Sequence, residues 1–436
     1  MYYQELLSEQ ERAIQEEVRA FARDRVSPEL VRAMDREEIE YPREYVRELG
    51  RQNLLGLRFD PEWGGRGLPW TAEVQAEEEI GVLGTALGCA FVMPSIVGEA
   101  LHRFGTEEQK ERFLRPMLKG DRISAEALTE PRGGSDFFGA TTLAEEKEDH
   151  FLINGQKRFV VGATEADLFL VYCRTNLEEN AEKHKRISTF IVERGEGVQT
   201  EHVYGLMGTR GGGTGRLVFR NVKVPKENLV GDLHGGALVF NQMMVPERLT
   251  SAAASLGMAR AALEVATRYS DKRFAFGRPI RRYQGVSFMI SDAATQLDAA
   301  RGLVYMAAKA ADQGAPNMRR LVSEAKKLAT KMAWDVSNIA MQVLGGIGYT
   351  DVYPIEKMVR DSRLSQIWTG TSEIMNLLIQ HEWYEEVLSG GSNARDVEKD
   401  AVSSGATAEK CFTDADMWEV HDQETGGRNQ ESGVEL

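Results

Sequence analysis

The chain has 436 residues and a formal net charge of −14, with 42% hydrophobic and 28% charged residues. This length exceeds what one simple core accommodates and predicts two or three packed units, while the composition is that of an ordinary globular protein. A protein that grips nucleic acid needs a basic face, and no basic stretch occurs, so we expect no nucleic-acid partner.

Residues 1–121 are predicted to form a helical domain. Ser8 and Glu11 make a capping box, and behind it apolar residues recur at helical spacing. Pro42 suits the first position of a further helix, which Gly50 is expected to end.

One segment of this domain resembles a membrane span in length. Residues 80–98 carry no charge, and such a run approaches the length of a transmembrane helix. It contains several glycines and a proline, so we interpret it as one helix buried in a large core and expect no membrane span. The acidic run Glu77, Glu78 and Glu79 just before it is interpreted as a solvated helix face.

The cysteines and the N-terminus indicate the compartment. Cys89, Cys173 and Cys411 are odd in number and far apart, which favours no disulfide framework and a reducing environment. The acidic N-terminal residues lack the basic start and apolar stretch of a signal peptide, so we expect a cytoplasmic protein.

From residue 122 to residue 233 the apolar pattern shortens to strand length and predicts a β domain, a barrel or sandwich. Asn154-Gly155 lies between two apolar runs and predicts a hairpin with a type I′ turn. Residues 167–174, 187–193 and 217–224 are predicted as further strands.

The pattern becomes helical again over residues 234–388. Four long amphipathic stretches with short connections predict a four-helix bundle, and they cover residues 247–273, 285–313, 317–344 and 371–388. Residues 389–436 are acidic and rich in Gly and Ser, which is typical of a disordered tail. The predicted fold class is therefore mainly α with a β domain in the middle.

Several common signatures are missing from the sequence. There is no GxGxxG, P-loop, HExxH or GxSxG pattern, which argues against nicotinamide, ATP, zinc and serine-hydrolase chemistry. We predict no metal site.

A series of short motifs carries a family resemblance instead. Residues 128–136 read Leu-Thr-Glu-Pro-Arg-Gly-Gly-Ser-Asp, and residues 367–374 read Ile-Trp-Thr-Gly-Thr-Ser-Glu-Ile. Between them come further elements, which occupy residues 153–157, 207–210, 222–228, 273–277, 342–346, 353–357 and 360–361. In this order, from about residue 6 to residue 388, the chain resembles the acyl-CoA dehydrogenases.

The resemblance implies FAD as the cofactor. Leu128 and Thr129 match the loop at the polar edge of the flavin, and Phe159 stands where the family usually has Trp on the ring face. Val161 replaces the usual Thr or Ser near flavin N5, and valine cannot donate a side-chain hydrogen bond. The remaining cofactor positions implied by the resemblance are Arg273, Phe276, Gln284, Gln342, Gly345, Gly346, Thr371 and Glu373.

The family shares its FAD site between subunits, so the resemblance also implies an oligomer, a homotetramer built as a dimer of dimers. Arg273 and Gln284 match positions that reach the FAD of a neighbouring subunit. An electron-transferring flavoprotein is the implied redox partner.

The resemblance leaves one question open, because the family's usual catalytic base falls at Thr369. A hydroxyl is far too weak a base to remove the proton α to a thioester. A minority of the family, including isovaleryl-CoA and long-chain acyl-CoA dehydrogenases, carries the base at the position of Glu247, which we expect at the start of the first long bundle helix. Glu247 is therefore the predicted base, although a first-turn Glu favoured by the helix dipole would look the same.

The pKa of Glu247 is subject to opposing effects. Burial would raise it and a helix N-terminus would lower it, and we expect burial to dominate once substrate is bound. The positions that the resemblance assigns to acyl-CoA binding are Ser135, Arg248, Trp368, Thr369 and Gly370.

The sequence thus predicts α,β-dehydrogenation of an acyl-CoA to a trans-2-enoyl-CoA. An oxygen-using acyl-CoA oxidase and a catalytically silent flavoprotein scaffold or acyl-CoA sensor stay open as alternatives, as does a thioester on a carrier protein. The acyl group itself is not specified.

Overall fold

The computed structural model describes residues 4–178, 180–389, 395 and 397. The chain divides into two units, Met1–Asn376 and Leu377–Leu436. The first unit contains the cavity and the sheet described below. Apart from residues 389, 395 and 397, the predicted acidic tail lies outside the described residues, and so does Cys411.

Seven helices form the N-terminal part. They are α1 (Glu9–Asp24), α2 (Pro28–Asp35), α3 (Arg43–Arg51), α4 (Trp70–Gly81), α5 (Thr85–Phe104), α6 (Glu107–Gln109) and α7 (Arg115–Leu118). The predicted capping box at α1 is confirmed, because the Glu11 backbone N–H donates to Ser8 Oγ at 3.2 Å and the Ser8 N–H donates to Glu11 Oε2 at 2.8 Å.

The helix signals at Pro42 and Gly50 are each displaced by one residue. Pro42 is the N-cap of α3 and does not occupy its first turn, and the helix continues to Arg51. A Cβ at Gly50 would lie 2.0 Å from the backbone oxygen of Lys119. This glycine therefore permits a close approach of two chain segments within the helix and does not end it.

Residues 80–98 do not form one helix, so that prediction is wrong. The chain leaves α4 after Gly81 and enters α5 at Thr85, and Gly84 between them has a φ of +103°, which breaks a helix. In the described part of the chain, α5 alone is long and apolar enough to span a membrane, and 89% of its most apolar window is buried inside the protein.

The acidic run on α4 is also not a solvated face. Glu77, Glu78 and Glu79 are only 1–3% exposed, because α4 lies between α1, α5 and the long C-terminal helices. Glu78 accepts from Arg301 Nη2 at 2.9 Å, and Glu79 accepts from Arg260 Nη2 at 2.8 Å. Glu79 also pairs with an arginine of α1, so both carboxylates are compensated inside the protein.

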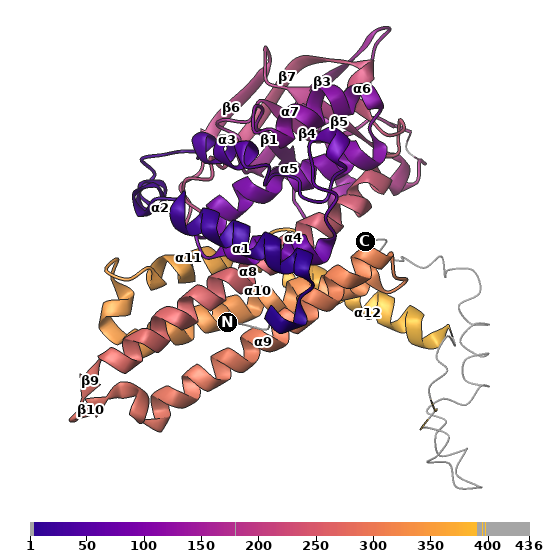
Figure 1. Cartoon of the computed structure of the whole chain (residues 1–436). Helices are drawn as coiled ribbons and strands as arrows, with labels where there is room; N and C mark the ends of the chain where they lie inside the picture. The colour runs from indigo at the N-terminus through magenta and orange to yellow at the C-terminus, as the bar shows by residue number, and fades with distance from the viewer. Residues whose placement is uncertain (1–3, 179, 390–394, 396, 398–436) are drawn as a thin grey trace, which may run out of the picture. The chain divides into compact units, whose positions relative to one another are not determined.

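The middle part is a twisted sheet of eight strands (Figure 1). They are β1 (Ser124–Ala127), β2 (Leu143–Glu146), β3 (His150–Val160), β4 (Leu168–Arg174), β5 (Ile187–Glu193), β6 (Val198–Val203), β7 (Gly215–Pro225) and β8 (Leu229–Val230). The order is β6-β7-β3-β2-β4-β5-β8, and β1 pairs in parallel with β4.

The hairpin predicted at Asn154-Gly155 is wrong. Both residues lie inside β3, where the register with β7 shifts between Ile153 and Gly155. Gly155 has a φ of +151°, and a Cβ there would lie 2.7 Å from the Cα of Thr142. The Asn-Gly pair therefore makes a β-bulge, whose glycine lets the neighbouring chain approach.

Long helices dominate the C-terminal part (Figure 1). They are α8 (Gly236–Lys272), α9 (Gln284–Gln313) and α10 (Met318–Leu344), followed by α11 (Ile355–Ser365) and α12 (Ser372–Leu388). The short hairpin β9 (Phe274–Ala275) and β10 (Arg278–Pro279) joins α8 to α9. The predicted fold class, mainly α with a β domain in the middle, is confirmed, although α11 was not predicted.

Helices α4 and α8 cross at very close range. A Cβ at Gly257 on α8 would lie 2.1 Å from the backbone oxygen of Glu78, and a Cβ at Gly81 on α4 would lie 2.4 Å from that of Ala254. The two backbones touch because neither glycine carries a side chain at the crossing. This contact fixes the parts of α4 and α8 that line the candidate site.

Candidate active site

A cavity of about 440 Å³ opens where four parts of the first unit meet. Its walls come from α4 and α5, from the ends of β1 and β3 with the residues that follow them, from α8, and from the segment 364–374. Eleven of the predicted site residues line it together, namely Leu128, Thr129, Ser135, Phe159, Val161, Glu247, Arg248, Trp368, Thr369, Gly370 and Thr371.

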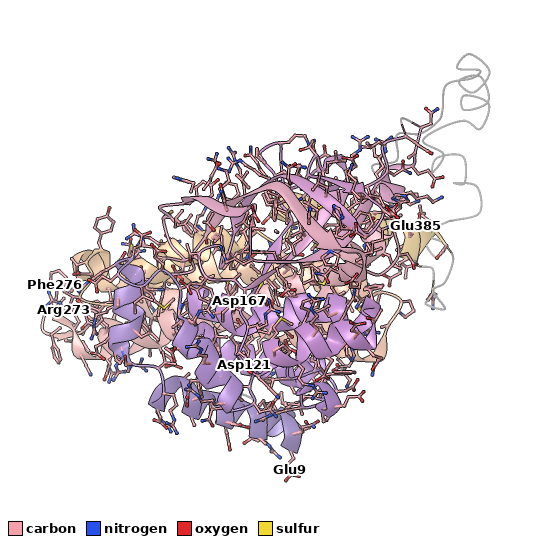
Figure 2. The ribbon with its side chains drawn as sticks, turned by 90° about the horizontal axis from the view of Figure 1, so that it is seen from above. Glu9, Asp121, Asp167, Arg273, Phe276 and Glu385 are labelled. Carbon is pink, nitrogen blue, oxygen red and sulfur yellow. The ribbon has the colours of Figure 1, made fainter. Side chains whose placement is uncertain are left out.

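The other predicted cofactor residues do not line this cavity, and they are Arg273, Phe276, Gln284, Gln342, Gly345, Gly346 and Glu373. Arg273 and Phe276 lie at the hairpin that joins α8 to α9, at the far end of both helices (Figures 1 and 2). The Phe276 side chain is 96% exposed in the single chain. The roles that the resemblance implied for these seven residues therefore stay predictions.

Glu247 lies in the middle of α8 and not in its first turn. The helix begins at Gly236, and Pro246 is inside it, so the expected effect of the helix N-terminus on Glu247 is absent. Burial raises the pKa of Glu247 well above its usual range, and the charge and hydrogen bond of Glu126 raise it further, against the charges of Arg248 and Lys326. Burial is the largest of these effects, and its dominance once substrate is bound stays a prediction.

The sequence reasoning missed Glu126, which lines the cavity from β1. Its neighbours Ala125 and Ala127 are fully buried, so strand alternation turns the Glu126 side chain to the opposite side. Its carboxylate accepts a hydrogen bond from Tyr172 Oη at 3.1 Å. A charged residue between two alanines, just before the Leu-Thr-Glu-Pro motif, was the signal that could have found it.

The backbone at Thr369 adopts an unusual conformation. Thr369 has a φ of +50° and Gly370 a φ of +90°, so two successive residues are left-handed, which is costly at a β-branched residue. Lys326 Nζ on α10 donates to the Gly370 backbone oxygen at 2.6 Å, and Ser251 Oγ on α8 lies 3.3 Å from Thr369 Oγ1. These contacts hold the loop against the cavity.

Two cations lie near Glu247. Lys326 is fully buried, and burial together with the charge of Arg248 lowers its pKa to about 7. Arg248 is also buried, and burial and Arg319 lower its pKa to about 10. Its side chain therefore lies inside the protein and not at the surface.

Buried donors face the cavity without a partner among the described residues. They include Arg248 Nε, Arg158 Nε and Trp368 Nε1. A buried donor without an acceptor costs free energy, so the site has the hydrogen-bonding capacity to hold a polar ligand.

Comparison with known proteins identifies the family of this chain. Residues 8–121, 125–222 and 234–383 match the N-terminal, middle and C-terminal domains of acyl-CoA dehydrogenase. The short-chain specific acyl-CoA dehydrogenase of Clostridium acetobutylicum is 35% identical over 86% of this chain and 97% of its own length. The chain belongs to the acyl-CoA dehydrogenase family.

Two further members of the acyl-CoA dehydrogenase family are similarly close. A subunit of the caffeyl-CoA reductase–Etf complex of Acetobacterium woodii is 34% identical over 85% of this chain and 97% of its own. The solved butyryl-CoA dehydrogenase of Megasphaera elsdenii superposes with a TM-score of 0.81 at 32% identity, covering 86% of this chain and 98% of the other.

Members of the acyl-CoA dehydrogenase family bind FAD, so this chain is an FAD-dependent oxidoreductase that acts on a CH–CH group. The residues present suit a flat aromatic cofactor. Phe159 presents a ring that is 55% exposed beside the cavity, and its φ of +56° turns it out of the end of β3. The unpaired Trp368 Nε1 offers a donor to the same space.

The loop that carries Leu128 and Thr129 is anchored from β3. Lys157 Nζ donates to the Leu128 oxygen at 3.1 Å, and the Arg158 N–H donates to the Thr129 oxygen at 2.7 Å. Lys157 also pairs with Glu130 at 2.9 Å, and both residues are buried. A buried ion pair thus fixes the loop expected at the polar edge of the flavin of an acyl-CoA dehydrogenase.

Proposed function

We propose that this chain oxidises an acyl-CoA thioester to the trans-2-enoyl-CoA with Glu247 as the base. The observation that carries the proposal is the raised pKa of a buried Glu247 carboxyl in the cavity that Thr369 also lines. Ser251, one turn along α8 from Glu247, contacts Thr369. A carboxyl on this face of α8 therefore reaches the part of the cavity where the family's usual base would stand.

In the proposed reaction Glu247 takes the proton from the α carbon of the thioester. FAD, when bound, would supply the two-electron acceptor for the hydride that leaves the β carbon, and a C=C double bond would remain. The Thr369 backbone N–H donates to the thioester oxygen, on which negative charge develops as the proton leaves. Since a base must be deprotonated, the raised pKa of Glu247 makes it a stronger base but limits it at acid pH.

We assign the remaining roles by position. Ser135, Arg248, Trp368 and Gly370 line the cavity and would bind the acyl-CoA, with the cationic Arg248 suited to an anionic ligand. The residues that would hold FAD are Leu128, Thr129, Phe159, Val161 and Thr371, which line the cavity, together with Arg273, Phe276, Gln284, Gln342, Gly345, Gly346 and Glu373, which do not. Of the second set, Arg273 and Gln284 would reach the FAD of a neighbouring subunit.

The proposed acceptor of the electrons is an electron-transferring flavoprotein. The relative from Acetobacterium woodii is a subunit of a complex with such a protein, which supports this partner. We further propose a homotetramer, because the exposed Phe276 and the other cofactor residues outside the cavity would contact FAD bound to another subunit. We place this homotetramer in the cytoplasm.

An anaerobic titration of the FAD-loaded protein with a panel of acyl-CoAs tests the proposal. Bleaching of the flavin band is expected with the wild type and is expected to be lost in Glu247→Gln, which retains FAD. Glu264→Gln, an exchange on the same helix away from the cavity, serves as the matched control. Normal bleaching in Glu247→Gln would overturn the assignment of the base, and no bleaching of the wild type by any acyl-CoA would favour a silent flavoprotein.

A second measurement identifies the electron acceptor. Turnover that requires an electron-transferring flavoprotein, with negligible oxygen consumption, is expected. Rapid oxygen consumption without that partner would indicate an oxidase instead.

A further inference from the structure

Glu77 differs from the two carboxylates that follow it on α4. Glu78 and Glu79 each accept from a buried arginine, whereas neither Glu77 oxygen has a hydrogen-bond partner among the described residues. Glu77 is 1% exposed and lines the cavity. A buried carboxyl without a partner is costly and calls for an explanation in terms of what occupies the adjacent space.

The surroundings of Glu77 contain further unpaired polar groups. Thr85 Oγ1, which belongs to a residue of the same cavity wall, and Tyr45 Oη on α3 are both buried without a partner in the described structure. Burial raises the pKa of Tyr45 first, and the charge of Glu77 raises it further. The polar groups near this end of the cavity therefore have unused hydrogen-bonding capacity.

The electrostatic balance near Glu77 is negative. The one charged group that acts strongly on it is Glu73, and together with burial this neighbour raises the pKa of Glu77 well above its usual range. Arg58 is held by Glu73 at 2.6 Å and by Glu99 at 2.9 Å, so its charge is already compensated. A ligand group that donates hydrogen bonds or carries a positive charge would therefore bind favourably beside Glu77, whereas a ligand carboxylate would be repelled.

Glu77 lies at a distance from the proposed base along the cavity. A Cβ at Gly88 on α5 would lie 3.0 Å from Glu77 Oε1 and 3.9 Å from the Cβ of Ala254 on α8. Ala254 follows Glu247 by seven residues, so it lies about 10 Å further along α8. Cys89 also lines the cavity, and burial together with the charges of Glu77 and Glu247 raises the pKa of its thiol well above its usual range.

We propose that Glu77 selects acyl groups that carry a hydrogen-bond donor near the end remote from the thioester. An ammonium group is expected to bind more tightly there than a hydroxyl group. The proposal rests on the proposed function and specifies its substrate class. A side chain at Gly88 would press on the Glu77 carboxyl, since a Cβ there would lie 3.0 Å from Glu77 Oε1, and Thr85 contributes a second polar group to the wall of the same cavity. A donor at the end of the acyl chain would form a hydrogen bond with the buried Glu77 carboxyl. An unsubstituted chain leaves that carboxyl without a partner, and a chain that ends in a carboxylate is repelled by it.

Calorimetric binding to the FAD-loaded Glu247→Gln variant tests this without depending on turnover. The probes are acyl-CoAs from butyryl to decanoyl with four kinds of end: amino, hydroxyl, unsubstituted and carboxylate. At the best chain length the amino-ended probe is expected to bind about tenfold to a hundredfold more tightly than the unsubstituted one, as for a hydrogen bond to a charged group.

Two further exchanges in the same background identify the residue responsible. Glu77→Leu is expected to reverse the order, with unsubstituted chains bound best, and Glu77→Gln is expected to keep binding of the hydroxyl end while losing the advantage of the amino end. Gln75→Leu, an exchange on the same helix outside the cavity, is the control and is expected to leave the order of binding of the four probe ends unchanged.

Three outcomes would overturn the proposal. They are equal binding of all four ends, tightest binding of the carboxylate end, or an unchanged order in Glu77→Leu and Glu77→Gln. Equal binding would indicate that water satisfies Glu77. Failure of the proposed function is a separate result, because it appears as absent flavin bleaching in the wild type whatever the order of binding.

Discussion

Glu247 on α8 and Glu126 on β1 line the same cavity, and the charge of Glu126 and a hydrogen bond from it raise the pKa of Glu247 beyond the effect of burial. Two neighbouring ionised carboxylates repel each other unless a proton lies between them. Tyr172 Oη donates to Glu126, so the pair is held from the sheet side, while Arg248 and Lys326 act on Glu247 from the helix side. The basicity of the proposed base is therefore set by a neighbour from another part of the fold.

Replacing Glu126 with Gln is expected to shift the pH dependence of the reaction. Because the amide carries no charge, the pKa of Glu247 falls, and the rise of kcat/KM with pH moves to lower pH by about one unit or more. The measurement is the pH profile of flavin reduction by stopped flow. Glu145→Gln, at an exposed position of β2, is the control. An unmoved profile in Glu126→Gln would remove Glu126 from this role.

We predict that the proposed base can be moved from position 247 to position 369. Glu247→Gln is expected to abolish flavin reduction, and the double variant Glu247→Gln/Thr369→Glu is expected to regain part of it. A carboxylate at position 369 enters the same cavity, and Ser251 beside Thr369 is small enough to give way. The rate constant of anaerobic flavin reduction reports the result. Equal inactivity of both variants, with FAD bound, would show that position 369 no longer points at the α carbon.

The glycine crossing of α4 and α8 makes a strong prediction on stability. Gly257→Ala places a methyl group 2.1 Å from the Glu78 oxygen, so the helices must separate, at a cost of about 1–3 kcal/mol or more. Gly302→Ala on α9 is the matched control, since a Cβ there meets nothing within 4 Å and is expected to stabilise the helix slightly. Thermal unfolding of the FAD-loaded proteins measures both, and an equal Tm for the two variants would contradict the crossing geometry.

The buried pair Lys157–Glu130 predicts a loss of stability in acid. Burial alone would raise the pKa of Glu130, but the charge and hydrogen bond of Lys157 and the hydrogen bonds from Thr141 bring it down to about 2. A folded-state pKa below the unfolded value gives stability that is present above about 4.5 and lost as the pH falls toward about 2. The Tm of the wild type should therefore drop through this range by several degrees beyond that of Glu130→Gln.

Lys157→Met tests the same pair by a different route. It leaves Glu130 buried without its cation, which is expected to cost about 3–5 kcal/mol, and it frees the loop of Leu128 and Thr129. Loss of FAD on gel filtration together with a lower Tm is the expected result. Full retention of FAD with an unchanged Tm would show that the loop holds its place without Lys157.

The sequence was sufficient where the signal is local. The capping box at Ser8 needs only four residues, and it was found where predicted. The order of helical, β and helical parts follows from changes of apolar period, which persist over many residues. The motifs that suggested the family also identified the residues that converge on the cavity, since eleven of them line it together.

The errors occurred where a distant segment determines the local structure. Asn154-Gly155 favours a turn by itself, but pairing with both β2 and β7 extends β3 through it and makes a bulge. The run Glu77 to Glu79 looks solvated until α1, α8 and α9 bring arginines to it. Glu247 was placed at a helix start because proline usually begins helices, whereas in α8 the helix continues through Pro246.

The crossing of α4 and α8 limits how this protein can evolve. The same backbone contact fixes where Glu77 on α4 and Glu247 on α8 lie along the cavity. A shift of either helix that enlarged the cavity around Glu77 would therefore also move the proposed base. New substrate preferences must then arise by exchange of single side chains, chiefly on α5, whose residues line the cavity without taking part in that contact. Directed libraries would do best to vary Cys89, Val92 and Met93 and to leave Gly81 and Gly257 untouched.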